Sequence, residues 1–297
     1  MEQLIQKILL KHNIKYSTIK KATSGFTNYV YFIDDDKVLK LSKDKQSSSL
    51  HNESVIYKNI NLSNIPSYIA SGKIDDTEYL IITKLQGKAL YSIWHTLDNK
   101  TRCDIVKQIA NILKNFNSNS GDFLTGHSHI DDWKEHWYQR LTQRKLEMQQ
   151  LGLDTTSLNL FLDKHLDETF SDNRYGLVYN DAHFDNFLFD GSKVSLIDFD
   201  RVKHCPIDYE LMIFKTMCDN PSKFASEVDD PFVDAKDYEM VYETFKQTYK
   251  ELFEIKHIDI RVKVYQFNYL MRQAYGIKNI DWAKQILKDF DTMLQNI

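Results

Sequence analysis

One stretch in the second half of the chain restricts the fold more than any other. The apolar residues 177–179 run into a polar loop, and an Asp-Gly turn at residues 190–191 then returns the chain to a second apolar run that ends at Asp198. The first apolar run predicts a strand, and Asp-Gly between two short apolar runs is a strong hairpin signal. We therefore expect the loop and the hairpin to bring Asp181, Asn186 and Asp198 to one place.

These three side chains match what phosphoryl transfer requires. A carboxylate orients the acceptor hydroxyl, a neutral oxygen ligand helps to hold magnesium, and a second carboxylate joins the metal to the nucleotide phosphates. Asp181, Asn186 and Asp198 supply these groups in that order, at the Asp-x-x-x-x-Asn spacing of kinase catalytic loops. The alternative is a surface hairpin with incidental acidic residues.

The same stretch resembles the aminoglycoside phosphotransferase and choline kinase superfamily. The catalytic loop of that superfamily reads His-Gly-Asp-x-His-x-x-Asn and is followed by Ile-Asp-Trp or Ile-Asp-Phe. This chain keeps Asp181, His183 and Asn186, but it has Tyr179 and Asn180 where the family usually has His and Gly. The resemblance implies that Asp181 is the catalytic base, that Asn186 and Asp198 bind Mg²⁺, and that His183 supports the loop.

Further parts of a nucleotide site precede this loop in the expected order. A glycine-containing segment with Gly25 and Asn28 resembles the family's nucleotide loop, in which backbone N–H groups face phosphate oxygens. Lys40 lies on the next predicted strand, as the phosphate-binding lysine of kinases does. Glu53 lies in the following predicted helix, where it can pair with Lys40. The alternatives are an ordinary turn, an edge-strand lysine and a solvated glutamate.

Residues 81–85 resemble the hinge strand of the family, whose backbone groups hydrogen-bond adenine. We take Thr83 and Leu85 as its cofactor-binding residues. The resemblance implies ATP as the nucleotide, with GTP not excluded.

The pattern of predicted elements gives an α+β fold. Residues 29–33 with 38–41, and residues 68–71 with 79–83, predict two hairpins, and a helical pattern lies between them at residues 48–60. Residues beyond Gly87 are mostly helical. We expect a two-lobed, protein-kinase-like fold, with a small antiparallel-sheet N-terminal lobe over residues 1–86 and a mostly helical lobe over residues 87–297.

Composition excludes some classes of partner. The formal net charge is only −4, which gives no reason to expect nucleic acid or an anionic membrane as a partner. The three cysteines, Cys103, Cys205 and Cys218, follow neither a disulfide nor a zinc pattern, and they favour a reducing cytoplasm. Residues 1–16 predict an amphipathic helix rather than a signal peptide.

The acceptor is less defined than the nucleotide. Few residues separate Asp198 from the helix predicted near Ile207, so there is no room for the long activation segment of protein kinases, and a small-molecule acceptor is favoured. Glu227, Asp229 and Asp230 form an acidic cluster that would suit a cationic acceptor. The alternative for the cluster is a solvated, helix-capping loop.

We therefore expect an ATP- and Mg²⁺-dependent small-molecule kinase. An aminoglycoside-type antibiotic is the first candidate acceptor, and choline, an amino alcohol or a sugar are alternatives. A nucleotide-binding pseudokinase is the main alternative from another class, although the complete set of Asp181, Asn186 and Asp198 argues against it. We expect Asp208 or Glu210 to anchor the catalytic loop. The sequence leaves the oligomeric state open.

Overall fold

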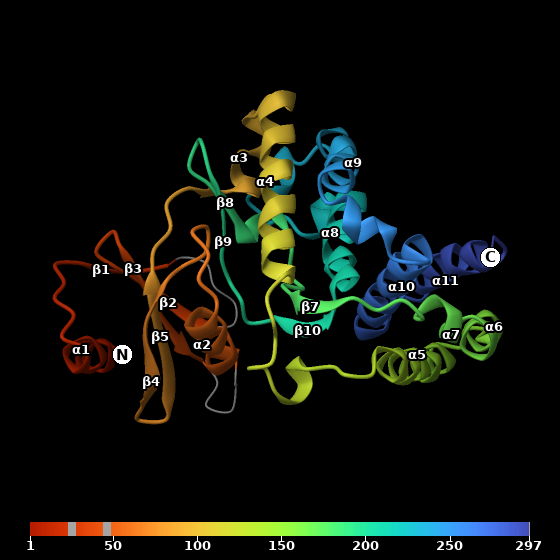
Figure 1. Cartoon of the computed structure of the whole chain (residues 1–297), viewed down its shortest axis with the longest axis horizontal. Helices are drawn as coiled ribbons and strands as arrows, with labels where there is room; N and C mark the ends of the chain where they lie inside the picture. Colours follow the sequence, from red (N-terminus) through yellow and green to blue (C-terminus); the bar gives the residue numbers. More distant parts are fainter. Residues whose placement is uncertain (23–27, 44–48, 297) are drawn as a thin grey trace. The chain divides into compact units, whose positions relative to one another are not determined.

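The computed structural model describes residues 1–22, 28–43 and 49–296, and the chain divides into two compact units. The first unit comprises residues 1–94 and 184–202, and the second comprises residues 95–183 and 203–296 of the described chain. Figure 1 shows the elements of both units.

An antiparallel sheet forms the centre of the first unit, with the strand order β1-β2-β3-β5-β4. Its strands are β1 (Ile19–Lys21), β2 (Asn28–Ile33), β3 (Lys37–Ser42), β4 (Tyr68–Ile74) and β5 (Thr77–Thr83). Asp34, Asp75 and Asp76 take positive φ angles in the two hairpin turns, a conformation that aspartate tolerates better than most residues. Both predicted hairpins are present, and β3 joins them by pairing with β5.

Two helices pack against this sheet: α1 (Glu2–Lys11) and α2 (Ser49–Asn59). Apolar side chains of α1, among them Ile8 and Leu9, lie in a buried cluster with Leu39 and Ile81 of the sheet. Figure 1 shows α1 and α2 beside the strands. Burial of this apolar surface is the main stabilising term for such a helix, because a helix this short is marginal on its own.

The helix predicted over residues 1–16 ends earlier than the apolar pattern indicates. Asn13 takes a left-handed conformation with a φ of 54°, and the N–H groups of Asn13 and Ile14 bond to the carbonyls of Leu10 and Leu9. This is a Schellman-type C-terminal cap, which closes α1 at Lys11.

A second small sheet of the first unit carries the predicted catalytic hairpin, in the order β6-β8-β9. Its strands are β6 (Lys88–Ala89), β8 (Phe187–Phe189) and β9 (Val194–Leu196). Asp190 closes the hairpin by accepting hydrogen bonds from the N–H groups of Ser192 and Lys193, at 2.8 and 2.7 Å. Gly87 lies so close to β8 that a Cβ there would be 2.7 Å from the backbone carbon of Phe189, so only glycine fits.

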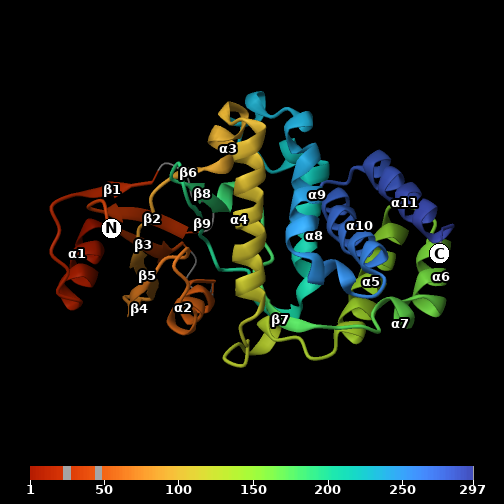
Figure 2. The same cartoon turned by 45° about the horizontal axis from the view of Figure 1, so that its top comes forward.

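The second unit is mostly helical. Its helices are α4 (Asn99–Asn117), α5 (Trp133–Gln150), α6 (Thr156–Lys164), α7 (Leu166–Thr169), α8 (Leu211–Asp219), α9 (Glu239–Thr248), α10 (Ile258–Gly276) and α11 (Ile280–Leu294). A two-stranded antiparallel sheet, β7 (Tyr175–Val178) with β10 (Lys203–Pro206), completes it. Figure 2 shows α4, α9 and α8 running side by side. Side chains of Asp98, Asp132 and Asn279 cap α4, α5 and α11, as the sequence predicts for Asp98.

Short helices complete the secondary structure. In the first unit α3 (Leu90–Ile93) follows β6. The 3₁₀ helices are η1 (Trp94–Thr96), η2 (Gly126–Ser128), η3 (Phe184–Asn186), η4 (Ile207–Glu210), η5 (Pro221–Lys223), η6 (Asp230–Phe232), η7 (Ala235–Tyr238) and η8 (Lys250–Glu254). None of the helices in the described ranges is both long and apolar enough to cross a membrane.

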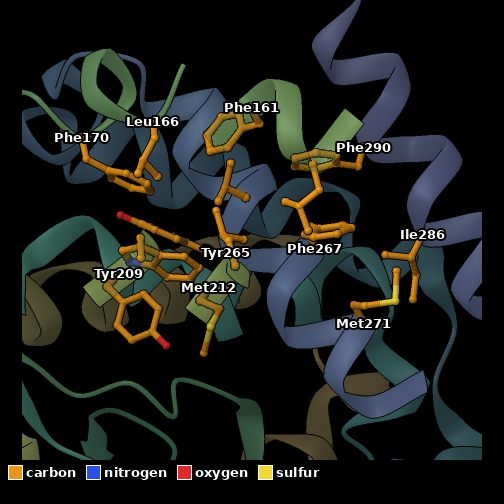
Figure 3. Packing of buried hydrophobic residues seen from close by; sticks show 14 of the residues in the cluster. Phe161, Leu166, Phe170, Tyr209, Met212, Tyr265, Phe267, Met271, Ile286 and Phe290 are labelled. Carbon is orange, nitrogen blue, oxygen red and sulfur yellow. The ribbon is translucent and has the colours of Figure 1, made fainter. Parts of the chain in front are cut away.

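Aromatic and aliphatic side chains from several helices fill the core of the second unit (Figure 3). Phe267 of α10 and Phe290 of α11 lie with ring centroids 4.2 Å apart. Within this core, the guanidinium of Arg261 forms a fully buried ion pair with Asp208, with 2.7 Å between Nε and Oδ2, and Tyr265 also donates to this carboxylate. This ion pair ties η4 to α10.

The structure departs from the sequence-based expectation at one further helix. The segment predicted as one helix over residues 157–170 is divided at His165 into α6 and α7. The lobe boundary expected near Gln86 and Gly87 stays a prediction. The first compact unit includes residues 1–94, and residues 184–202 belong with it.

Candidate active site

Three predicted site residues meet within the first unit. Lys40 lies on β3, Glu53 on α2, and Asp198 just beyond β9. The Lys40 ammonium lies 2.7 and 2.9 Å from the two carboxylate oxygens of Glu53, and 2.9 Å from Oδ1 of Asp198. The structure thus places the proposed phosphate-binding lysine, its helix partner and the proposed metal carboxylate in direct contact.

Two of the three side chains in this contact are buried. Glu53 is fully buried and Lys40 nearly so, whereas the side chain of Asp198 is 41% exposed. Burial alone would lower the pKa of Lys40, but the carboxylates of Glu53 and Asp198 outweigh it and raise that pKa above its ordinary value. Lys40 is therefore charged at physiological pH, which is compatible with the phosphate-binding role predicted for it.

Two further groups hold Glu53, and the sequence analysis missed both. The hydroxyl of Tyr57, one helical turn further along α2, donates to Oε1 of Glu53 at 3.1 Å, and the backbone N–H of Phe199 does so at 3.3 Å. The i, i+4 spacing of Glu53 and Tyr57 was visible in the sequence as a signal. The Phe199 contact depends on tertiary structure and had no such signal.

A cavity of about 350 Å³ adjoins this cluster, and all of its lining residues belong to the first unit. Five of the predicted site residues line it: Asn28, Lys40, Thr83, Leu85 and Asp198. Apolar side chains form most of the rest of its wall, among them Phe32, Val38, Ile82, Leu188 and Ile197. An apolar slot that ends at a lysine and a carboxylate is suited to a flat heterocycle that carries phosphates.

The predicted hinge runs along one wall of this cavity. The hydroxyl oxygen of Thr83 accepts a hydrogen bond from the N–H of Ser67 at 2.8 Å, and the N–H of Lys84 bonds to the carbonyl of Asp36. Within the described ranges, no group accepts a hydrogen bond from the backbone N–H of Leu85. Leu85 therefore offers a donor to a bound base, whereas the side chain of Thr83 is used to fix the strand.

The proposed metal ligands come from the two sides of the hairpin. Asn186 ends η3, and its carbonyl accepts a hydrogen bond from the N–H of Ile197 at 3.0 Å, next to Asp198 in the chain. Asp198 takes a left-handed conformation with a φ of 68°, which is strained for an aspartate in a non-turn position. Carboxylate and amide oxygens are ligands that Mg²⁺ prefers, and nucleotide phosphates usually complete its coordination. Both residues therefore fit a magnesium ion that binds together with a nucleotide.

Asp200 is an acidic neighbour that the sequence analysis did not single out. Burial raises its pKa to about 7, and the nearby carboxylates of Asp198 and Glu53 act in the same direction.

The described residues contain no cluster of three or more His, Cys, Asp or Glu side chains that could hold a metal ion by themselves.

Asp181, the proposed base, belongs to the second unit and is described with it. Nε2 of His183 lies 3.5 Å from its carboxylate. The fully buried carboxylate of Glu210 accepts hydrogen bonds from the N–H groups of Tyr179 and Asn180, at 2.8 and 3.2 Å. Asn180 takes a φ of 61° here. The expected anchor of the catalytic loop is thus Glu210, while Asp208 is paired with Arg261.

The acidic cluster proposed for the acceptor lies at the surface of the second unit. Glu227 and Asp230 are exposed, and Asp229 accepts a hydrogen bond from the hydroxyl of Ser226 at 2.6 Å. Nearby, Asp234 caps η7, and Asp237 forms an ion pair with Arg102. These contacts are those of a capped surface loop, and an acceptor role for the cluster stays a prediction. Gly25 lies outside the described residues.

Comparison with known proteins agrees with this geometry. The gentamicin complex of APH(2″)-IIa matches with a TM-score of 0.64 at 18% identity, covering 97% of this chain and 95% of that one. The GDP complex of aminoglycoside 2′-phosphotransferase-IIIa matches at 0.67 and 16%, covering 99% and 98%. A choline kinase from Cryptosporidium parvum Iowa II matches at 0.57 and 15%, covering 99% and 95%. These similarities confirm the predicted kinase-like fold.

A comparison with curated protein sequences finds no match. Residues 18–242, however, match the phosphotransferase enzyme family, and this span contains every motif from the predicted nucleotide loop to the acidic cluster. The match extends over well more than half of the chain. The protein is therefore a member of the phosphotransferase enzyme family.

Proposed function

We propose that this phosphotransferase transfers the γ-phosphoryl group of ATP, with Mg²⁺, to a hydroxyl group of a small molecule. The observation that carries the proposal is the contact of Lys40 with both Glu53 and Asp198 at the wall of a nucleotide-sized cavity. A lysine held in this way by two carboxylates is the arrangement that phosphoryl transfer uses to position nucleotide phosphates. GTP is not excluded as the donor.

In this proposal each residue of the first unit has a separate task. The apolar wall around Val38 and Ile82 receives the base, and Leu85 donates a backbone hydrogen bond to it. Lys40 binds phosphate oxygens, and Glu53 keeps the lysine oriented. Asn186 and Asp198 would hold the magnesium ion, which when bound neutralises charge on the phosphates.

Asp181 is the proposed catalytic base. It orients the acceptor hydroxyl and accepts its proton as the oxygen attacks the γ-phosphorus. The bond between the γ-phosphorus and the bridging oxygen breaks, the electron pair stays on that oxygen, and ADP leaves. The two hydrogen bonds from the loop backbone to Glu210 fix the segment immediately before Asp181.

For the acceptor, an aminoglycoside-type compound is the first candidate. The named structures of similar fold include complexes with gentamicin and streptomycin. The similarity to a choline kinase keeps choline, another amino alcohol or a sugar as alternatives. We place the enzyme in the cytoplasm.

The test is acceptor-dependent ADP release by the wild type and by Asp181→Asn, measured over a panel of aminoglycosides, amino alcohols and sugars. Removing a general base costs roughly 10²–10⁴ in rate. Asp181→Asn is expected to lose about that much kcat while its affinity for Mg-ATP stays unchanged.

Asp104→Asn is the matched control, because Asp104 is a surface residue on α4 that pairs with Lys107. It should keep wild-type turnover. Near wild-type turnover by Asp181→Asn would show that the loop has been assigned wrongly. A wild type that binds Mg-ATP but turns over no member of the panel would favour the pseudokinase alternative.

A further inference from the structure

A cavity of about 460 Å³ lies wholly within the second unit, at the amino-terminal end of α5. The loop before α5, the first turns of α5 and the first residue of β10 line it. Neither the nucleotide residues nor Asp181 line this cavity. Most of the side chains that line it are polar or charged, with Ile130 as an apolar exception.

The acidic residues of the wall already have partners. Oδ1 of Asp131 lies 2.9 Å from Nε2 of His129, and Oδ1 of Asp132 accepts the N–H of Glu135 at the start of α5. Oε1 of Glu135 accepts a hydrogen bond from the side-chain amide of Gln139 at 2.8 Å. These carboxylates therefore have local structural tasks.

The two cations of the wall, Arg140 and Lys203, differ from these carboxylates in their bonding partners. Nε of Arg140 donates to Nε2 of His136 at 2.6 Å, and Nζ of Lys203 donates to the carbonyl of His127 at 3.1 Å. Across residues 1–22, 28–43 and 49–296, no carboxylate forms an ion pair with either cation. Both bond only to neutral groups, so their charge is not compensated by direct contact.

This positive charge affects the pKa values of nearby groups. Burial lowers the pKa of His136 to about 4, and the charges of Arg140 and Lys203 contribute to the shift. Burial also lowers the pKa of Lys203, and Arg140 acts in the same direction. Two partly buried cations at one cavity, each bonded to neutral groups, favour the binding of an anion.

We propose that this cavity binds an oxyanion group, a phosphate or a carboxylate, through Arg140 and Lys203. The guanidinium matches the geometry of such a group, and the ammonium adds a second charge-assisted hydrogen bond. Lys203 pairs with Val178 across the β7–β10 sheet, and Val178 precedes Asp181 by three residues in the chain. The oxyanion group belongs either to a free anion or to the acceptor. Only its assignment to the acceptor rests on the proposed function.

The first experiment is calorimetric titration of the nucleotide-free full-length chain with inorganic phosphate. We expect saturable binding that persists in Lys40→Ala, because the phosphate-binding lysine of the first unit is not involved. Arg140→Gln combined with Lys203→Gln should weaken phosphate binding at least about tenfold, since each charge-assisted hydrogen bond accounts for roughly that factor.

Lys134→Gln is the matched control, because Lys134 is an exposed cation of the same helix outside the cavity, paired with Asp167. It should bind phosphate like the wild type. Arg140→Lys keeps the charge and should retain part of the affinity even if the double variant folds poorly. Absence of binding in the wild type would overturn the proposal, and so would binding lost in Lys40→Ala but kept in the double variant.

A second arm identifies the source of the anion. Acceptors that the enzyme phosphorylates are compared in pairs, with and without a phosphate or carboxylate substituent. If the acceptor supplies the group, the double variant raises KM for the anionic member at least about tenfold and leaves kcat nearly unchanged. If a free anion occupies the cavity, KM is unchanged for both members while calorimetry still shows the loss.

The two proposals can fail separately. If no acceptor is phosphorylated, the proposed function fails, but the calorimetric result still decides whether the anion site exists. NMR titration of the His136 ring gives an independent readout. Arg140→Gln should raise the pKa of His136 from about 4 towards its ordinary value, because a neighbouring positive charge has been removed.

Discussion

At the scale of single residues, the site depends on one buried cation with two acidic partners. Glu53 is fully buried and accepts hydrogen bonds from Lys40, Tyr57 and Phe199. Asp198, in contrast, is partly exposed and also bonds to the lysine. Glu53 therefore sets the position of Lys40, and Asp198 remains accessible for a second ligand.

Glu53→Gln should lower the free energy of unfolding by up to about 3 kcal/mol. Breaking a buried ion pair by removing one partner costs about that much, and the remaining contact with Asp198 keeps the loss at the lower end of the range. Affinity for Mg-ATP should also fall, because Lys40 loses its orientation. Urea unfolding and a thermal-shift titration with Mg-ATP measure the two effects.

The control is Glu254→Gln, a change of an exposed glutamate that should alter stability by no more than about 0.5 kcal/mol. If Glu53→Gln is as stable as this control and binds nucleotide equally well, the pair does not position the lysine.

The residue-scale features differ in how visible they were in the sequence. The contact of Lys40 with Glu53 and Asp198 could be expected because each of the three falls at a fixed place in an ordered set of motifs. The magnesium role of Asn186 stays a prediction. Arg140 and Lys203 could not be predicted, because they are 63 positions apart in a chain whose fold brings them to one cavity. In the sequence, a lysine or arginine that bonds only to neutral groups cannot be distinguished from any other surface cation.

At the scale of elements, η4 fixes the strand that leads to the proposed base. Glu210 ends η4, and its carboxylate accepts backbone N–H groups just beyond β7 and the side-chain amide of Asn117 on α4. Burial nevertheless raises the pKa of Glu210 to about 7, above the value near 4.5 that it has when unfolded. The hydrogen bonds favour the charged form but do not outweigh burial.

This shift gives stability a pH dependence. Between about pH 4.5 and pH 7 the folded state holds a proton on Glu210 that the unfolded state has released. The contribution of Glu210 to the free energy of unfolding therefore falls as pH rises through this window, by at most about 3 kcal/mol. Glu210→Gln cannot titrate, so the wild type should lose stability relative to this variant between pH 5 and pH 7.5.

Urea unfolding of both proteins at the two pH values measures the difference. A constant offset between them reflects the lost acceptor oxygen and does not depend on pH. Parallel stability profiles across the window would show that Glu210 is ionised throughout the folded state.

Element boundaries were predictable where local chemistry defines them. The Asp-Gly hairpin and the cap at Asp98 are local signals, and both are present in the structure. The pairing of β3 with β5, by contrast, joins strands from two separate hairpins and has no local signal. The end of α1 at Lys11 depends on a left-handed Asn13, which the continuing amphipathic pattern concealed.

At the scale of the whole molecule, family membership and fold limit the chemistry but not the acceptor. The family match covers residues 18–242, and structures of similar fold include proteins named for aminoglycosides and for choline. Acceptor identity depends on a few side chains that vary within one fold, and for this reason a motif-based prediction stops at the reaction class. Because of the charged cavity beside α5, an acceptor screen should include anionic compounds.

The central claim is that the γ-phosphoryl group of ATP passes to a small-molecule hydroxyl. Its most direct test follows isotope-labelled γ-phosphate by mass spectrometry, in the presence of Mg²⁺ and the acceptor panel. The account predicts label in a phosphate ester of one acceptor class, strongly reduced in Asp181→Asn. Label found only in inorganic phosphate, or retained entirely in ATP that the protein binds, would contradict it.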